Sequence, residues 1–211
     1  MASLPFERPT ANEPSVARAP TPMHQLRDAT RLAHASIEGS LPLMDPALTR
    51  DRYVRIVEAF YGFYAPLEPR IAHAAAVHGA LLAVDSRAKA PLLVLDLLAL
   101  GETTDDIDAL PRCTALPHVG SASRALGALY VLEGATLGGQ IIRRRLGDRL
   151  DLEGGNGAAF FVSYGEATGA MWKRFTTYVD GYASLDLGAA IGAAIDTFEA
   201  LERWLDASLE R

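Results

Sequence analysis

Apolar residues recur at intervals of three and four along most of this chain, and strict alternation of apolar and polar residues is scarce. An interval of three or four places side chains on one face of an α-helix, whereas alternation is typical of a half-buried β-strand. The clearest stripe lies near the carboxyl end and consists of Leu187, Ile191, Ala194, Phe198, Leu201 and Leu205. The pattern predicts an all-α fold, and 49% hydrophobic residues among 211 are enough for a single-domain helical bundle with one core.

Proline and glycine mark where the predicted helices begin and end. We expect helices over residues 22–39, 49–66, 68–82, 86–100, 120–150, 164–182 and 185–209. Pro91 either lies in the first turns of its helix or marks a later start, and Gly101 ends that helix. We expect an acidic polar loop around residues 105–108 and a glycine-rich loop over residues 153–158.

The first 21 residues have a different composition from the rest of the chain. Five of the 12 prolines lie within the first 22 residues, together with charged side chains and few large apolar ones. Such a segment cannot bury enough apolar surface to offset the entropy of ordering it. We therefore expect residues 1–21 to be a disordered N-terminal arm and residues 22–211 to form one domain.

Charge and cysteine content exclude several classes of protein. The net charge of −6 is opposite to that of a nucleic-acid-binding surface, and the lone Cys113 cannot form an internal disulfide or a cysteine-based zinc site. No uninterrupted apolar run reaches the roughly 18 to 20 residues that span a bilayer. No basic start followed by an apolar stretch resembles a secretory signal. We expect a cytoplasmic protein that binds neither membranes nor nucleic acid.

Three glycines, Gly134, Gly138 and Gly139, interrupt a segment that is otherwise rich in helix-forming residues. Each costs a helix about 1 kcal/mol relative to alanine. Glycine allows a helix to bend and allows a flat ligand to touch the main chain. The alternatives are a helix that ends at Gly139 or a tight crossing with another helix.

His34 lies within the apolar pattern of the first predicted helix, and Glu38 follows four residues later. At that spacing the carboxylate can accept a hydrogen bond from the imidazole and strengthen its other nitrogen as a metal ligand. The alternative is an ordinary solvated pair. Arg27 and Lys173 can present cations to an acidic ligand, or they are ordinary surface charges.

Two segments resemble those of one protein family. The stretch from Leu26 to Glu38 resembles the proximal helix of biliverdin-forming heme oxygenases. The stretch Leu-Tyr-Val-Leu-Glu-Gly-Ala-Thr-Leu-Gly-Gly-Gln, residues 129–140, resembles their distal helix and looks most like the bacterial branch that supplies bilin to phytochromes. The order of the two segments, about 100 residues apart, and the all-α pattern agree with this family from residue 22 onward.

The resemblance implies that heme lies between the first helix and a kinked, glycine-rich distal helix. His34 would be the iron ligand with Glu38 behind it, and Gly134 and Gly138 would be the catalytic positions that place backbone against the heme and tilt bound oxygen. The remaining heme contacts implied by the family are Gly139 on the distal helix, Arg27 and Lys173 at the propionates, and Tyr130 beside the position of a tyrosine contact. A further candidate is Thr136, whose hydroxyl either orients a water or bonds to its own helix.

This sequence departs from the family in two respects. The first is Ala135, which stands where many members carry an aspartate that organises distal water. The second is Thr177, where an arginine is expected, together with Leu129, where a tyrosine contacts a propionate. The first departure requires another source of protons for bound oxygen. The second leaves open how the heme is seated and which carbon is attacked.

As a member of this family, the chain would be an oxidoreductase that cleaves heme to biliverdin, carbon monoxide and ferrous iron. Heme would be both substrate and prosthetic group, molecular oxygen the co-substrate, and an external donor such as ferredoxin or a reductase the source of electrons. A bacteriophytochrome is a candidate recipient of the bilin. The alternatives are a heme carrier of the same fold that does not cleave heme, which the missing aspartate favours, and a heme-free helical interaction domain.

Overall fold

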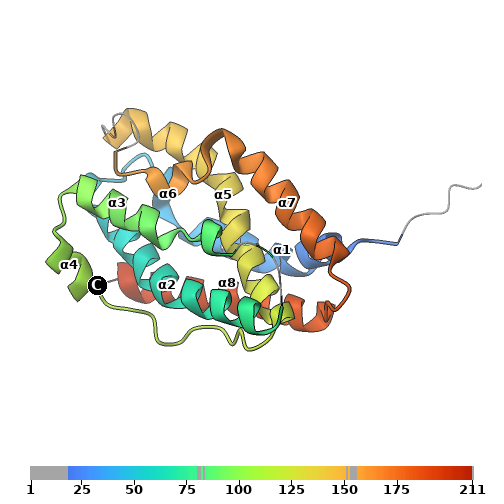
Figure 1. Cartoon of the computed structure of the whole chain (residues 1–211). Helices are drawn as coiled ribbons and strands as arrows, with labels where there is room; N and C mark the ends of the chain where they lie inside the picture. Colours follow the sequence, from blue (N-terminus) through green and yellow to red (C-terminus); the bar gives the residue numbers. More distant parts are fainter. Residues whose placement is uncertain (1–18, 80–81, 83, 151, 153–155, 211) are drawn as a thin grey trace, which may run out of the picture.

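The computed structural model describes residues 19–79, 82, 84–150, 152 and 156–210, and within that part of the chain it contains helices and no strands (Figure 1). The all-α prediction is confirmed. The α-helices are α1 (Pro22–Ser40), α2 (Arg50–Val77), α3 (Ala90–Leu100), α4 (Thr104–Ala109), α5 (Ala122–Leu150), α6 (Ala159–Val162), α7 (Thr168–Gly181) and α8 (Leu187–Leu209). Short 3-10 turns lie at Pro42–Met44 (η1), Asp85–Arg87 (η2) and Gly165–Ala167 (η4). Most of the predicted arm and half of the predicted glycine-rich loop lie outside the described residues.

Helix α1 begins and ends close to the predicted positions. The Thr21 side chain accepts a hydrogen bond from His24 N at 3.4 Å, and Pro22 occupies the first turn, where no backbone donor is needed. Leu41 is extended and precedes Pro42, which disfavours further helix. The backbone N–H of Met23 donates to Asp180 of α7 at 2.9 Å, so the start of α1 is fixed to another helix.

Helix α2 is continuous through Pro66 and Pro69, so the predicted break at Pro66 is wrong. Each proline removes one helical hydrogen bond, which favours a break. However, Phe63, Leu67 and Ile71 on either side are at most 1% exposed and belong to one core, and this shared burial keeps the helix intact. The helix ends at Val77, before the predicted end at residue 82.

Other boundaries differ from the predictions where local capping was overlooked. The acidic segment forms α4 rather than a loop, because Thr103 and Asp106 cap its first turn reciprocally. Pro91 marks the later start of α3 at Ala90, and Gly101 ends that helix with a φ of +112°, as glycine allows. The predicted helix over residues 164–182 begins at Thr168, after η4.

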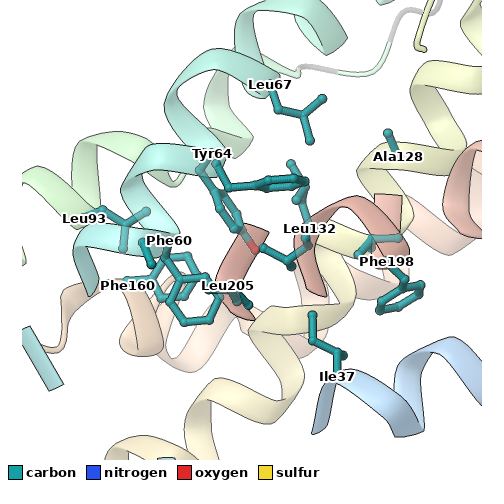
Figure 2. Packing of buried hydrophobic residues seen from close by; sticks show 14 of the residues in the cluster. Ile37, Phe60, Tyr64, Leu67, Leu93, Ala128, Leu132, Phe160, Phe198 and Leu205 are labelled. Carbon is teal, nitrogen blue, oxygen red and sulfur yellow. The ribbon is translucent and has the colours of Figure 1, made fainter. Parts of the chain in front are cut away.

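The core lies between α8 and the helices around it (Figure 2). Figure 2 shows Phe60 and Tyr64 of α2 close to Phe160 of α6, and the ring centres of Phe60 and Phe160 are 5.2 Å apart. Helices α5 and α8 cross closely at Gly127, where an added Cβ would lie 2.0 Å from the carbonyl oxygen of Ala190. The absence of a side chain at Gly127 is thus a packing requirement of the fold.

Helix α5 remains helical from Ala122 to Leu150, through all three glycines of the predicted distal segment. Figure 1 shows its second half, yellow to orange, running in a different direction from its first half. The stretch Ala122–Leu146 has the length and hydropathy of a membrane span, contrary to the sequence analysis, but 61% of the most apolar window is buried inside the protein. That burial is typical of a core helix in a soluble protein.

Candidate functional site

His34 and Glu38 form a pair on the surface of α1. His34 Nδ1 lies 3.5 Å from Glu38 Oε2, and the two side chains are 50% and 67% exposed. The edge of Phe198 in α8 supports the imidazole, with the two rings perpendicular and their centres 5.7 Å apart. Within the described part of the chain, His34 Nε2 has no hydrogen-bond partner. This nitrogen is therefore available to a ligand, while the Glu38 carboxylate is placed to accept a hydrogen bond from Nδ1–H.

One turn before this pair, α1 touches α5. The Thr30 hydroxyl donates to Leu26 O at 2.8 Å, so the Tyr130 hydroxyl, 3.3 Å away, donates to Thr30 Oγ1. His34 and Gly134 lie one turn beyond these two residues, on the same helix faces. Tyr130 therefore fixes the approach of the two helices that would enclose a heme.

Gly134 and Gly138 form an open strip on α5. An added Cβ at either position would meet no atom within 4 Å, so neither glycine is explained by packing inside the protein. Leu137 and Ile141 share this helix face and are 41% and 59% exposed. Together these four residues present bare main chain and exposed apolar side chains, which suits the flat face of a large ring.

Gly139 and Thr136 do not belong to the open strip. An added Cβ at Gly139 would lie 2.7 Å from the carbonyl oxygen of Phe161 in α6, so this glycine permits a helix contact. Thr136 is buried, and its hydroxyl donates to Glu133 O at 2.7 Å. Of the two alternatives for Thr136, the structure shows the bond to its own helix.

The two predicted propionate ligands lie at the surface. The Arg27 side chain is 71% exposed, and its Nε is 3.9 Å from the carboxylate of Asp28. Arg27 lies seven residues before His34, which places both on nearly the same face of α1. Lys173 is exposed on α7, next to Trp172, whose ring packs on Tyr130 at 6.0 Å between centres. The structure thus brings α1, α5 and α7 together at Tyr130, with both cations exposed on α1 and α7.

A buried ionic cluster lies behind the glycine strip, and the sequence analysis missed it. Its members are Arg87, Lys89, Glu133 and Tyr164. Glu133 Oε1 accepts from Lys89 Nζ and from the Tyr164 hydroxyl, both at 2.7 Å, while Oε2 accepts from Arg87 Nη1. Glu133 and Lys89 are each 1% exposed and Arg87 is 4% exposed. The cluster ties α5, directly before Gly134, to η2 and to the segment before η4.

The environment of the cluster shifts the pKa values of its members. Burial lowers the pKa of the Lys89 ammonium, and the neighbouring Glu133 carboxylate opposes that effect. Burial and the charge of Glu133 raise the pKa of the Tyr164 hydroxyl. That hydroxyl therefore stays protonated and donates a hydrogen bond to Glu133. Glu68, next to the cluster, accepts from Lys89 N and Ala90 N and caps the start of α3.

One sequence signal could have revealed the cluster. Glu133 is the only charged residue between Arg124 and Arg143. A single acid in the middle of a buried apolar helix needs a cationic partner, because an unpaired buried charge is costly. The sequence does not identify Arg87 and Lys89 as those partners, since they lie more than 40 residues away in the chain.

The residues present fit a heme. Among the described residues there is no group of three histidine, cysteine, aspartate or glutamate side chains that could hold a metal ion by itself. The site instead offers one imidazole with a free nitrogen and, on the helix that meets α1 at Tyr130, a strip without side chains. A porphyrin supplies four nitrogen ligands to its iron, so the protein would have to supply only one further ligand and an apolar surface against the ring.

Comparisons with known proteins point to one family. Residues 22–207 match the family model described as heme oxygenase. Heme oxygenase PigA from Pseudomonas aeruginosa is 29% identical over 152 residues, which is 72% of this chain and 74% of that protein. Two solved structures share the fold at 18% identity and cover 89% of this chain. They are heme oxygenase from Leptospira interrogans, with a TM-score of 0.69 over 100% of that chain, and heme oxygenase 2 from Chlamydomonas reinhardtii without heme, with 0.71 over 97%.

Proposed function

Because this chain belongs to the heme oxygenase family, we propose that it binds one heme against α1 and α5 and cleaves it to biliverdin, carbon monoxide and ferrous iron. The single observation that supports the proposed site is the position of His34 and Gly134, each one turn beyond the contact between Thr30 and Tyr130. One helix then supplies an imidazole, and the other supplies open main chain. When bound, heme supplies the iron that activates oxygen and is also the substrate.

On the proximal side, His34 Nε2 is the proposed axial ligand. Glu38, whose Oε2 lies 3.5 Å from Nδ1, is placed to accept a hydrogen bond from Nδ1–H, which would fix the tautomer with Nε2 unprotonated, and the ring of Phe198 lies edge-on against the imidazole. His34 would hold the heme iron from the α1 side, and no side chain of α1 would then cover the face turned towards α5. This arrangement is compatible with a heme that the protein binds through His34 and that is also the substrate of the reaction.

On the distal side, Gly134 and Gly138 let the backbone approach the macrocycle. The open space at these two glycines would be bounded by main chain, and we propose that this shape influences which carbon of the ring is attacked. Ala135 is exposed and carries no ionisable group, and the hydroxyl of Thr136 is committed to Glu133 O. We therefore propose that water beside the open backbone supplies the protons. The buried Glu133 cluster holds the helix in place.

At the edge of the site, Arg27 and Lys173 are the proposed partners of the heme propionates. Both cations are exposed, so we propose that they orient the ring rather than bury charge. Electrons come from an external donor such as ferredoxin or a reductase. We propose a cytoplasmic location. We also propose a bacteriophytochrome as the recipient of the bilin, because residues 129–140 resemble the branch that supplies bilin to phytochromes.

The test combines a hemin titration with turnover. One equivalent of hemin should give a saturable Soret spectrum of a histidine-bound heme. Added ferredoxin, ferredoxin reductase, NADPH and oxygen should then yield a bilin on chromatography and carbon monoxide trapped by myoglobin. Loss of the Soret band without bilin or carbon monoxide would indicate a heme carrier. The absence of a stoichiometric heme spectrum would overturn the proposal.

A further inference from the structure

Helix α6 lies between α3 and α5 and contacts both of them (Figure 1). It has only four residues, Ala159–Val162, and a helix of that length does not form by itself in water. Its place in the fold therefore comes from its contacts. On the side of α2, the rings of Phe160 and Phe161 pack against Phe60, with 5.2 and 6.3 Å between ring centres, and anchor α6 in the core.

Asp96 of α3 fixes the first turn of α6. Its two carboxylate oxygens accept hydrogen bonds from the backbone N–H groups of Ala159 and Phe160, the second at 2.8 Å. The first N–H groups of a helix have no partner within that helix, so this carboxylate satisfies two of them. Asp96 is buried, so water cannot easily replace either bond if it is lost. The one charged residue in the apolar helix α3 is thus explained by its contact with α6.

The carboxyl-terminal half of α6 contacts α5. The carbonyl oxygen of Phe161 lies so close to Gly139 that an added Cβ there would be 2.7 Å away. The next residue of α5, Gln140, donates from Nε2 to Val162 O at 3.0 Å. Both contacts are made to the main chain of α6 by the two residues that directly follow Gly138. A shift of α6 would therefore move this part of the open glycine strip with it.

The glycine strip is supported at both ends and not between them. Glu133, directly before Gly134, belongs to the buried ionic cluster, and α6 supports the two residues after Gly138. At the two glycines themselves, an added Cβ would meet no atom within 4 Å. The position of the open main chain is therefore set by the ionic cluster on one side and by α6 on the other.

We propose that Asp96 is a positioning residue for the heme face: by holding α6, it determines how closely the main chain at Gly138 approaches the heme. The inference rests on the proposed function, because it takes Gly138 to face the ring. Asp96 is buried on α3, so it acts through α6 and not by contact with heme. A displacement of about 1 Å at a reacting face is enough to change its chemistry.

The first measurement compares the heme-free wild type with Asp96→Asn at about pH 8. Burial raises the pKa of Asp96 to about 6, so the wild-type carboxylate is ionised at that pH. The amide has nearly the same shape but only one acceptor oxygen, so one N–H group of α6 loses its partner. In hydrogen exchange followed by mass spectrometry, exchange across residues 134–146 should increase by at least about fivefold more than exchange across α8.

Ile107→Ala on α4 is the matched control for a general loss of stability. Ile107 is buried, so its truncation destabilises the protein through a cavity, and α4 lies at the edge of the molecule beyond α3 (Figure 1). In this variant, exchange across residues 134–146 and across α8 should increase alike. A role of Asp96 in stability alone would give the same result as this control.

The second measurement uses the heme-loaded protein, reduced and saturated with carbon monoxide. The stretching frequency of the bound carbon monoxide depends on the polar main-chain groups near it. Asp96→Asn should shift or broaden this band, whereas Ile107→Ala should leave it as in the wild type. The Soret band of a histidine-bound heme should remain in both variants, because His34 lies on α1.

If Asp96→Asn does not fold, Gln140→Met breaks the link at its other end, because methionine has a similar length and no N–H donor. The same two changes are then expected. The inference is overturned if exchange across residues 134–146 rises no more than exchange across α8, or if the carbon monoxide band matches the wild type. A wild type that binds no heme would instead contradict the proposed function, and the exchange measurement would still decide whether α6 holds α5.

Discussion

Lys89 Nζ lies 2.7 Å from Glu133 Oε1, and each of the two residues is 1% exposed. Arg87 binds the other oxygen of the same carboxylate, so one buried acid on α5 compensates two buried cations. Glu133 is followed directly by Gly134, the first open position on the proposed heme face. The stability of the fold and the position of that face therefore depend on the same side chain.

Replacing this carboxylate should destabilise the protein strongly. In Glu133→Gln, the Arg87 guanidinium cannot lose its proton and is left buried without a counter-charge. We expect the free energy of unfolding to fall by about 3 to 5 kcal/mol, measured by urea denaturation of the heme-free protein. The control is Glu199→Gln, which removes an exposed pair with Arg203 and should cost less than about 0.5 kcal/mol. Similar losses in the two variants would contradict this account of the cluster.

The glycines of α5 should respond to alanine in opposite ways. Gly138→Ala adds a methyl group in open space and should stabilise the heme-free protein by up to about 1 kcal/mol, because alanine favours helix. Gly127→Ala forces a Cβ to within 2.0 Å of Ala190 O and should cost about 1 to 3 kcal/mol through overpacking. Thermal and urea unfolding of the two variants measure this difference.

The same glycine tests the heme face. Gly138→Leu should leave the stability of the heme-free protein nearly unchanged and should weaken heme binding, because a large side chain then occupies the open strip. A hemin titration gives the affinity. If Gly138→Leu binds and cleaves heme like the wild type, the glycine strip does not face the heme.

Helical periodicity predicted the all-α fold and the apolar face of α8, because burial of one helix face dominates the free energy of folding. It failed at Pro66, where packing of Leu67 and Ile71 outweighs one lost hydrogen bond, and at Thr103, where a local capping box forms α4. Both failures reflect interactions that the period of the apolar pattern does not contain.

In the candidate site, too, contacts between residues close in sequence were predictable and contacts between distant residues were not. His34 with Glu38 is a local pair, so its spacing alone predicted the contact that the structure shows. Gly134, Gly138 and Gly139 are alike in sequence, and only coordinates separate the two open glycines from the one that packs on Phe161. Arg87 and Lys89 were missed because their partner is distant in sequence.

Asp96 should make stability depend on pH. This carboxylate is buried on α3 and accepts from the backbone N–H groups of Ala159 and Phe160; burial raises its pKa from 3.8 to about 6 despite those bonds. Between these values the folded protein binds more protons at this group than the unfolded chain does. Its contribution to the free energy of unfolding is therefore largest below about pH 4 and declines as the pH rises to about 6.

The comparison with Asp96→Asn isolates this effect. Relative to the variant, the wild type should lose roughly 2 kcal/mol of unfolding free energy between pH 4 and pH 6, because the amide does not titrate. Urea denaturation at several pH values gives the two profiles. Parallel profiles would show that Asp96 titrates alike in the folded and unfolded states.

Replacing His34 tests directly whether this residue binds the heme iron. His34→Ala removes the proposed iron ligand and the only imidazole of α1 in the proposed site, so the spectrum of a histidine-bound heme and the formation of bilin should both be lost. Added imidazole should restore much of the spectrum, because the small molecule can occupy the space left by the side chain. The matched control is His24→Ala, since His24 is an exposed histidine on the same helix whose side chain has no hydrogen-bond partner among the residues that the structure describes. An unchanged spectrum and turnover in His34→Ala would show that the iron has another ligand, and the placement of heme against α1 would then fail.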